Sequence, residues 1–198
     1  MLLISTSRRP TRRILSFAKD LRNSIPNSIK LQRGKRGLKD LLNAALEAGC
    51  DRVLLITRWK GSPGKLEMME INGGGFRTIP PLIYIKGIKL RREFGIEGRF
   101  IASSITLGRV EREGLELARS LSRFLRMPLL EDPRDARGEG TSIHISEDRA
   151  GALRVSVTSP RGAREVGPAF TIRHLIWELE SHGGSPEEPR EDNPQARI

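Results

Sequence analysis

Residues 4–21, ISTSRRPTRRILSFAKDL, join the end of a predicted strand to a predicted helix. The apolar run that begins at Leu2 predicts a short buried strand. From Ile14 to Ile25 the apolar residues recur at offsets of three and four, which predicts a helix with one apolar face. Pro10 is suited to the first helical position, and Pro26 ends the helix. A strand leading directly into a helix is the first sign of an α/β fold.

The predicted helix start carries an unusual charge. Four arginines crowd it, although the positive end of the helix dipole favours acidic residues. A bound phosphate would remove this conflict, because guanidinium groups, the free N–H groups of the first turn and the dipole all attract an anion. Ser7 and the two hydroxyl residues before it supply further donors. The alternative is that the arginines form an ordinary solvated face.

Strands and helices alternate along the following segments. We predict a strand over 28–31, a helix over 38–46, a buried strand over 52–59 and its hairpin partner over 65–71, with the glycines of 72–76 in a turn. Further on, 141–146 and 152–159 predict a second hairpin. Residues 167–180 predict a long strand, with a helix from His174 onward as the alternative. The fold class is therefore α/β, with mixed sheets and packed helices.

The chain resembles itself at an offset of 100 residues. Segment 14–25 aligns with 114–125, with Leu21 on Leu121 and Ala18 on Ala118, and each segment follows a short strand candidate. Any two amphipathic helices would share apolar positions, so chance is the alternative. The matching order of elements favours two similar halves, about 1–98 and 99–180. Residues 181–198 are polar and proline-containing, and we predict a disordered tail there.

Charge indicates a polyanionic partner. The net charge of the 198 residues is +11, and residues 1–37 hold ten Lys or Arg against the single acid Asp20. Other basic groups follow in the loop 32–37 and near residue 90. We predict an RNA-binding set that contacts phosphates: Ser7, Arg8, Arg9, Arg12, Arg13, Arg33, Lys35, Arg36, Lys86, Lys89, Arg91 and Arg92. Few aromatic residues are present, so the sequence predicts no base-stacking platform.

Catalytic and cofactor-binding signals are missing from the sequence. Its one cysteine, Cys50, has no histidine nearby, the three histidines lack the spacing of a metal site, and no phosphate-loop motif follows a strand. We therefore expect no enzyme activity, no cofactor and no metal. The apolar start is too short for a signal peptide, and no apolar run is long enough to span a membrane. We expect a monomeric cytoplasmic protein, or a nucleolar one in a eukaryote.

Several motifs resemble those of the Brix-domain family of ribosome-biogenesis proteins. ISTSRRPTRRILSFAKDL (4–21) is similar to the family's opening Thr-Ser-Arg-x-Pro turn and Arg-rich helix. INGGGFRTIPPLIYIKGIKL (71–90) and EVGPAFTIRHLIWEL (165–179) resemble its middle and late motifs, with Ala169 in place of the late motif's arginine. The short flanks resemble those of archaeal members.

The resemblance implies a fold of two similar halves, each like the anticodon-binding domain of class II aminoacyl-tRNA synthetases. It also implies a non-enzymatic factor in ribosomal RNA processing and subunit assembly, whose partners are precursor rRNA and other assembly proteins. Two other classes stay open: a tRNA-binding accessory module related to synthetases, and an RNA-modifying enzyme. The sequence does not identify the rRNA segment, the subunit or the protein partners.

Overall fold

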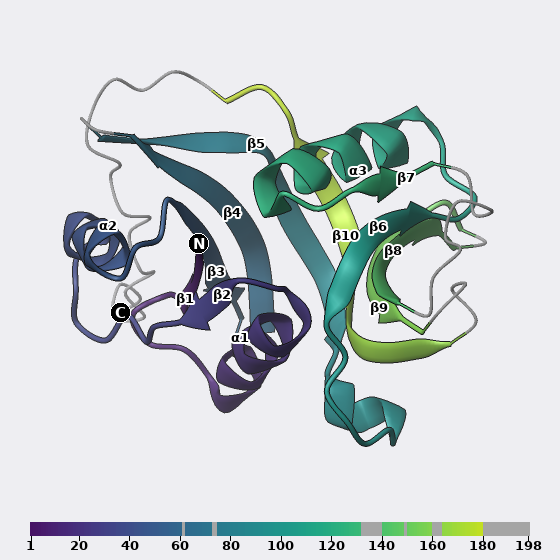
Figure 1. The fold of residues 1–198 in the computed structure, drawn as a ribbon, viewed down its shortest axis with the longest axis horizontal. Coiled ribbons are helices and arrows are strands. Elements are labelled where there is room, and N and C mark those ends of the chain that lie inside the picture. Colours follow the sequence, from purple (N-terminus) through teal and green to yellow (C-terminus); the bar gives the residue numbers. More distant parts are fainter. Residues whose placement is uncertain (61, 73–74, 132–139, 149, 160–163, 180–198) are drawn as a thin grey trace, which may run out of the picture.

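A single mixed sheet of ten strands runs through the protein (Figure 1). The structure, a computed structural model, describes residues 1–60, 62–72, 75–131, 140–148, 150–159 and 164–179. The elements in chain order are β1 (Leu2–Thr6), α1 (Arg12–Ser24), β2 (Ser28–Lys30), α2 (Leu38–Glu47), β3 (Arg52–Trp59), β4 (Ser62–Asn72), β5 (Gly75–Lys89), the 3-10 helix η1 (Arg91–Phe94), β6 (Ala102–Leu107), α3 (Arg112–Leu125), β7 (Leu129–Leu130), β8 (Thr141–Glu147), β9 (Leu153–Thr158) and β10 (Glu165–Ile176).

The sheet has the same pairing pattern when read inward from either end. Its strand order is β2-β1-β3-β4-β5-β10-β9-β8-β6-β7. At one end β1 lies parallel to β2 and β3, and at the other β6 lies parallel to β7 and β8. The strands between them, β3-β4-β5 and β8-β9-β10, are antiparallel. The antiparallel pair of β5 and β10 joins the two sets.

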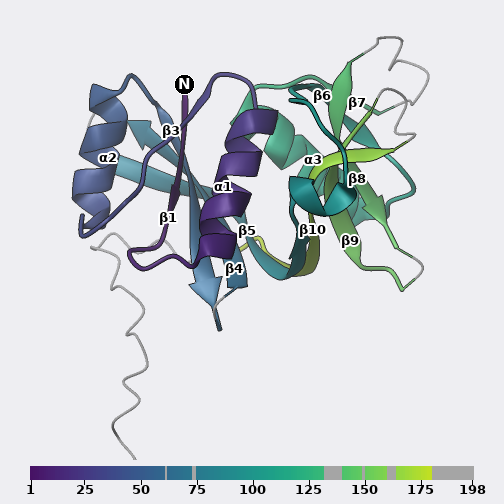
Figure 2. The same cartoon turned by 90° about the horizontal axis from the view of Figure 1, so that it is seen from below.

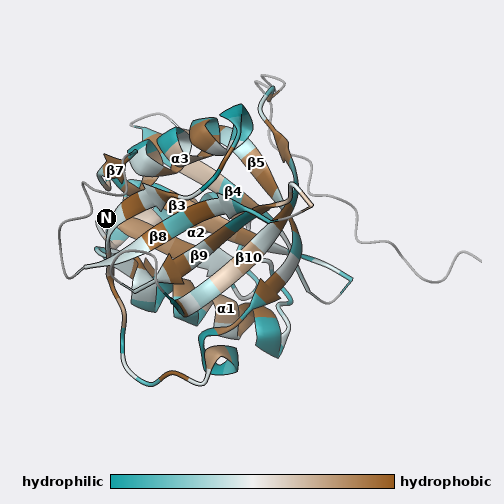
Figure 3. Cartoon of the chain, turned by 90° about the vertical axis from the view of Figure 1, so that its right-hand side faces the viewer, coloured by the Kyte–Doolittle hydropathy of each residue, from teal (hydrophilic) through white to brown (hydrophobic). Residues whose placement is uncertain are grey.

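Two helices cover one face of the sheet, and α2 covers part of the other. Apolar residues of α1 and α3 pack in one cluster with alternate residues of the strands, whereas α2 packs on Leu3, Val53 and Leu55. Figure 2 shows α1 and α3 near the middle of the molecule and α2 at its edge, and Figure 3 shows helices that alternate between hydrophobic and hydrophilic positions. Leu21 and Leu121, which the offset of 100 aligns, are equally buried at 7% exposure.

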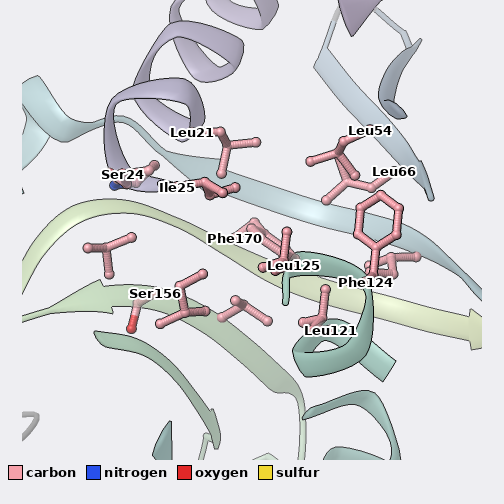
Figure 4. A pocket seen from close by; sticks show the side chains of 15 residues that line it. Leu21, Ser24, Ile25, Leu54, Leu66, Leu121, Phe124, Leu125, Ser156 and Phe170 are labelled. Carbon is pink, nitrogen blue, oxygen red and sulfur yellow. The ribbon is translucent and has the colours of Figure 1, made fainter. Parts of the chain in front are cut away.

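A small apolar pocket separates α1 from α3 (Figure 4). Leu21 and Ile25 line it from α1, Leu121 and Phe124 from α3, and Phe170 from β10. Its volume is about 40 Å³, far below the ~300 Å³ at which ligand pockets begin. The pocket is therefore a packing space of the core and not a substrate site.

The end of α3 is tied to the start of β3 by charged groups. Arg52, although buried, donates a hydrogen bond to the carbonyl oxygen of Phe124. Asp51 accepts from Arg52 at 3.3 Å and forms an ion pair with Arg126. Burial tends to raise the pKa of Asp51, but hydrogen bonds from the N-terminal ammonium, Arg126 and Arg52 outweigh it and hold the pKa well below its usual range.

Most predicted elements are confirmed, and four details differ. Helix α1 begins at Arg12, two residues after the predicted Pro10, because the Thr11 side chain caps it. Residues 165–176 form a strand, so the alternative helix from His174 is wrong. Strands β5 and β7 were not predicted. The described strands form one sheet, whereas the sequence predicted a sheet in each half. The predicted tail 181–198 lies outside the described residues.

No helix in the described ranges combines the length and the apolar character needed to cross a membrane.

Candidate nucleic-acid interface

The turn between β1 and α1 concentrates positive charge at a helix start. Strand β1 is fully buried and ends at Thr6, and the Ser7 N–H donates to the carbonyl oxygen of Ile56 at 2.9 Å. The Thr11 side chain caps α1 by accepting from the Ile14 N–H at 3.4 Å. The first turn contains no acidic residue, and the arginines on either side of the cap, Arg8, Arg9 and Arg12, are exposed. Dipole and guanidinium charges thus have the same sign here.

Ser7 has a hydroxyl group without a partner. Its Oγ atom is buried and makes no hydrogen bond within the part of the chain that the structure describes. Buried polar atoms are normally hydrogen-bonded, so an orphan at the edge of a basic turn calls for an explanation. An acceptor that approaches the turn from outside would satisfy it.

Arg13 has a structural role that the sequence did not predict. Its guanidinium pairs with Glu93 of η1 at 2.6 Å and donates to the carbonyl oxygen of Ile88 at 3.0 Å. The Arg13 hydrogen bond lowers the pKa of Glu93, with help from the Leu90 N–H. Arg13, which was predicted to bind phosphate together with Arg8, Arg9 and Arg12, therefore joins α1 to η1.

The second predicted group, in loop 32–37, also contains exposed residues and a residue that makes contacts within the fold. Leu31 donates its N–H to the Ile4 carbonyl at 3.1 Å, so the loop leaves the sheet beside the end of β1. Lys35 and Arg36 are exposed, and the Arg36 guanidinium donates to the Gln32 carbonyl at 3.3 Å. Arg33 is only 8% exposed, and its Nε donates to the Arg36 carbonyl at 3.1 Å. The prediction that Arg33 contacts RNA conflicts with this burial, because its side chain serves the loop itself.

The third group lies against α1 through η1. The Arg91 N–H donates to Asp20 of α1 at 2.9 Å, while its guanidinium donates to the Gly98 carbonyl at 2.8 Å. Lys89 sits 4.0 Å above the ring of Phe94. Lys86 and Arg92 are exposed. The fold therefore brings residues 86–92 beside the helix that residues 8–13 begin, and it uses Lys89 and Arg91 in contacts of its own.

A further basic segment, residues 58–60, was not predicted from the sequence and lies at the carboxyl end of the parallel strands. Since β1, β2 and β3 are parallel, their carboxyl ends lie together, and β3 ends in exposed Arg58 and Trp59, followed by Lys60. A signal existed, because the two basic residues flank a tryptophan at the end of a predicted strand. Only the parallel pairing of β3 with β1 shows that they lie near Arg8 and Arg9.

The equivalent turn between β6 and α3 has different electrostatics. Arg109 and Arg112 occupy the positions that the offset of 100 gives to Arg9 and Arg12. Here Glu111 occupies the N-cap position, without a capping hydrogen bond from its side chain, and Glu113 lies in the first turn. Arg112 pairs with Glu116 at 2.8 Å. The second helix start is thus compensated within the chain.

The described residues show no arrangement typical of catalysis. No group of three or more His, Cys, Asp or Glu among them is placed to hold a metal ion. Cys50 is buried, and burial raises the pKa of its thiol, which disfavours the reactive thiolate. Burial also lowers the pKa of His144, whose Nδ1 lies 3.1 Å from the Thr106 hydroxyl. These groups are integrated into the fold and away from the basic turn.

Fold and surface together define a class: a basic α/β protein whose described strands form one mixed sheet and whose first helix has arginines and no acidic residue in its first turn. A "Probable Brix domain-containing ribosomal biogenesis protein" of Pyrococcus horikoshii is 44% identical over 98 residues, which is 50% of this chain and 43% of that protein. The match thus spans less than half of that relative's length. No protein-family model matches the chain.

Solved structures extend the likeness to nearly the whole chain. The crystal structure of a probable ribosomal biogenesis protein from Aeropyrum pernix K1 covers 90% of this chain and 97% of its own, with 25% identity and a TM-score of 0.69. Mil, an archaeal Imp4-like protein, shares the fold at 20% identity, with a TM-score of 0.61 over 89% of this chain and 99% of its own. The chain is a relative of the archaeal Brix domain-containing ribosomal biogenesis proteins, which confirms the resemblance found in its motifs.

Proposed function

We propose that this protein is a non-enzymatic RNA-binding factor in ribosome biogenesis. It binds the backbone of precursor rRNA through its basic N-terminal segment and assists rRNA processing and subunit assembly in the cytoplasm, as a monomer that meets other assembly proteins. The names of its relatives support the process, and the surface supports the kind of ligand. The same names do not favour the tRNA-binding alternative.

The observation that carries the proposal is the contrast between the two helix starts. Helix α3 has Glu111 and Glu113 at its positive pole, as the dipole favours. Helix α1 has arginines and no acid there, and the Ser7 hydroxyl next to it has no hydrogen-bond partner among the residues that the structure describes. A phosphate group at α1 compensates the charge and accepts from the hydroxyl. Such contacts position an RNA without reading its sequence.

We assign two tasks to the predicted RNA-binding residues. The contacts with the RNA backbone are assigned to the exposed basic residues and the Ser7 hydroxyl, namely Ser7, Arg8, Arg9, Arg12, Lys35, Arg36, Lys86 and Arg92. The other four hold that surface in place through the intrachain contacts described above, namely Arg13, Arg33, Lys89 and Arg91. Only the basic residues of the first set supply affinity that depends on salt.

A finer proposal concerns the origin of the fold. Residues 1–180 form one Brix domain of two similar halves, about 1–98 and 99–180, each resembling the anticodon-binding domain of class II aminoacyl-tRNA synthetases. The support is the shared order of elements: a strand, a helix, a parallel strand on one side, a parallel strand on the other, and two antiparallel strands. The first half adds α2, and β5 pairs with β10 at the junction.

Crosslinking the protein to RNA in its native cells, followed by sequencing of the bound RNA, tests the function. The proposal predicts enrichment of precursor rRNA over mature rRNA and tRNA. Enrichment of tRNA would support the synthetase-related alternative instead, and an absence of RNA above a mock control would refute both.

A further inference from the structure

Trp59 is the most exposed large hydrophobic side chain in the described ranges, at 62%. It is the last residue of β3, where the burial of the strand gives way to solvent. Arg58 and Lys60 flank it, and both are exposed. A large ring left in solvent between two cations serves no purpose in the core of this fold.

The backbone holds Trp59 in a defined place. Trp59 pairs with Ser62 across the β3–β4 hairpin, and Lys60 adopts a positive φ of 46°. Gly64 lies so close that a Cβ on it would be 2.4 Å from the Trp59 Cβ and 2.9 Å from the Trp59 N. Only glycine fits there, and its backbone fixes the base of the tryptophan side chain. The base of the Trp59 side chain is therefore packed against β4, and its ring extends into solvent.

This strand end lies at the basic edge of the sheet. The Ile56 carbonyl accepts from the Ser7 N–H at 2.9 Å, and Trp59 is three residues further along β3, or about 10 Å. In Figure 2 the arrowhead of β3 lies beside the start of α1. Exposed Arg58 and Lys60 flank Trp59 in the chain, and the turn that carries exposed Arg8 and Arg9 follows the neighbouring strand β1.

The residues around Trp59 favour an RNA base over a protein as the binding partner of its ring. Met1 and Leu46 are also exposed, but Met1 contacts Asp51 at the amino end of β3, and Leu46 lies in the last turn of α2, which leads to that end. Ile101 precedes β6 and Ile176 ends β10, and neither strand is a neighbour of β3. No other exposed large hydrophobic residue in the described ranges therefore lies on a strand beside Trp59 as in a protein hot spot. A basic groove with an aromatic platform is the arrangement that binds single-stranded nucleic acid.

We propose that Trp59 stacks on an unpaired base of a single-stranded RNA segment whose phosphates contact the start of α1. This inference rests on the proposed function and adds the state of the RNA: the bound segment is single-stranded at the β3 end. Base stacking tolerates any sequence, because every base offers a flat face.

The test measures affinity for two strands of about twelve nucleotides, oligoadenylate and an abasic strand with the same backbone. Trp59→Ala should weaken oligoadenylate binding about 5- to 150-fold, the range for one stacked base, and change abasic binding less than about two-fold. The salt slope should stay as in the wild type, because no charge is lost. Trp59→Phe should retain most of the affinity. Leu46→Ala, at the exposed but distant Leu46, should change neither.

Each alternative outcome separates the inference from the function. If Arg9 and Arg12 variants flatten the salt slope but Trp59→Ala binds oligoadenylate like the wild type, the inference is wrong and the proposed function stands. Equal losses for oligoadenylate and the abasic strand would also overturn it, as would a loss of binding to an assembly protein with RNA affinity unchanged. If the wild type binds neither strand, both proposals fail.

Discussion

Replacing Arg9 and Arg12 together with alanine should flatten the salt dependence of RNA binding without unfolding the protein. Both side chains are exposed at the positive pole of α1. For single-stranded RNA each phosphate contact contributes about 0.7 to the slope of log affinity against log salt, so two contacts contribute about 1.4. Between 50 and 200 mM salt, the ratio of wild-type to variant affinity should therefore fall about seven-fold. The free protein should gain ~0.3–1 kcal/mol per arginine at low salt, because repulsion from the dipole is relieved.

The chain supplies its own control in Arg109→Ala/Arg112→Ala. These arginines occupy the matching positions before and within α3, where Glu111 and Glu113 already compensate the charge. The control removes the same two charges from the whole protein, so it measures the effect of net charge alone. Its salt slope should stay within about 0.3 of the wild type.

Arg13→Ala should behave in the opposite way to Arg9→Ala/Arg12→Ala. It loses the half-exposed ion pair with Glu93 and the bond to the Ile88 carbonyl, which should cost about 1 kcal/mol and lower Tm by about 2–4 °C. Its salt slope should not change. The assay is fluorescence anisotropy with a labelled RNA from 50 to 200 mM salt, alongside thermal melts. The reasoning is refuted if Arg9→Ala/Arg12→Ala and the control Arg109→Ala/Arg112→Ala flatten the salt slope equally. It is also refuted if Arg9→Ala/Arg12→Ala destabilises the fold and leaves the salt slope unchanged.

The remaining predictions concern stability. The Arg13 hydrogen bond lowers the pKa of Glu93 in the folded protein. The ion pair therefore stabilises the fold above the unfolded pKa of about 4.3, and this stabilisation is lost as pH falls through the lower pKa of the folded state. In urea titrations Glu93→Gln should be ~0.5 kcal/mol less stable than the wild type at pH 7 and equally stable at low pH. Gly114→Ala should cost about 1–3 kcal/mol in the same titrations, since the new Cβ would lie 2.7 Å from the Val110 Cβ, and an unchanged midpoint would contradict that packing. Deletion of 181–198 should change Tm by less than about 2 °C, because this segment has almost no apolar residues to bury; a larger drop would show that the tail packs on the domain.

Local periodicity predicted the helices and most strands because each of these segments has an apolar face of its own. Strand β5 escaped prediction because Pro80 and Pro81 lie in its middle, and proline cannot donate to a sheet ladder. The sheet tolerates them at an irregularity: Met68 pairs with Ile79 and Leu66 with Ile83, so three β5 residues oppose one on β4. The single sheet also could not be foreseen, since it depends on the long-range pairing of β5 with β10.

The positive charge of the candidate site could be predicted from the sequence. Which of its residues are exposed and which make contacts within the fold could not. The clash of arginines with the helix dipole is visible in the sequence, and it pointed to the start of α1. Nothing local in the sequence shows that Arg13 meets Glu93, 80 residues away, or that Arg33 is buried in its own loop. The place of Trp59 depends on the parallel pairing of β1 with β3, which sequence spacing does not reveal.

Ultraviolet crosslinking of RNA to the protein, with the crosslinked peptides identified by mass spectrometry, tests the central claim most directly. RNA bound at the carboxyl ends of β1, β2 and β3 should give crosslinked peptides from residues 5–13, 32–37 and 58–60, and from residues 86–92, which lie beside α1. Peptides around Arg109–Arg112, at the matching edge of the second half, should carry no crosslinks above background. Crosslinks concentrated around Arg109–Arg112, with residues 5–13 and 58–60 free of them, would contradict it.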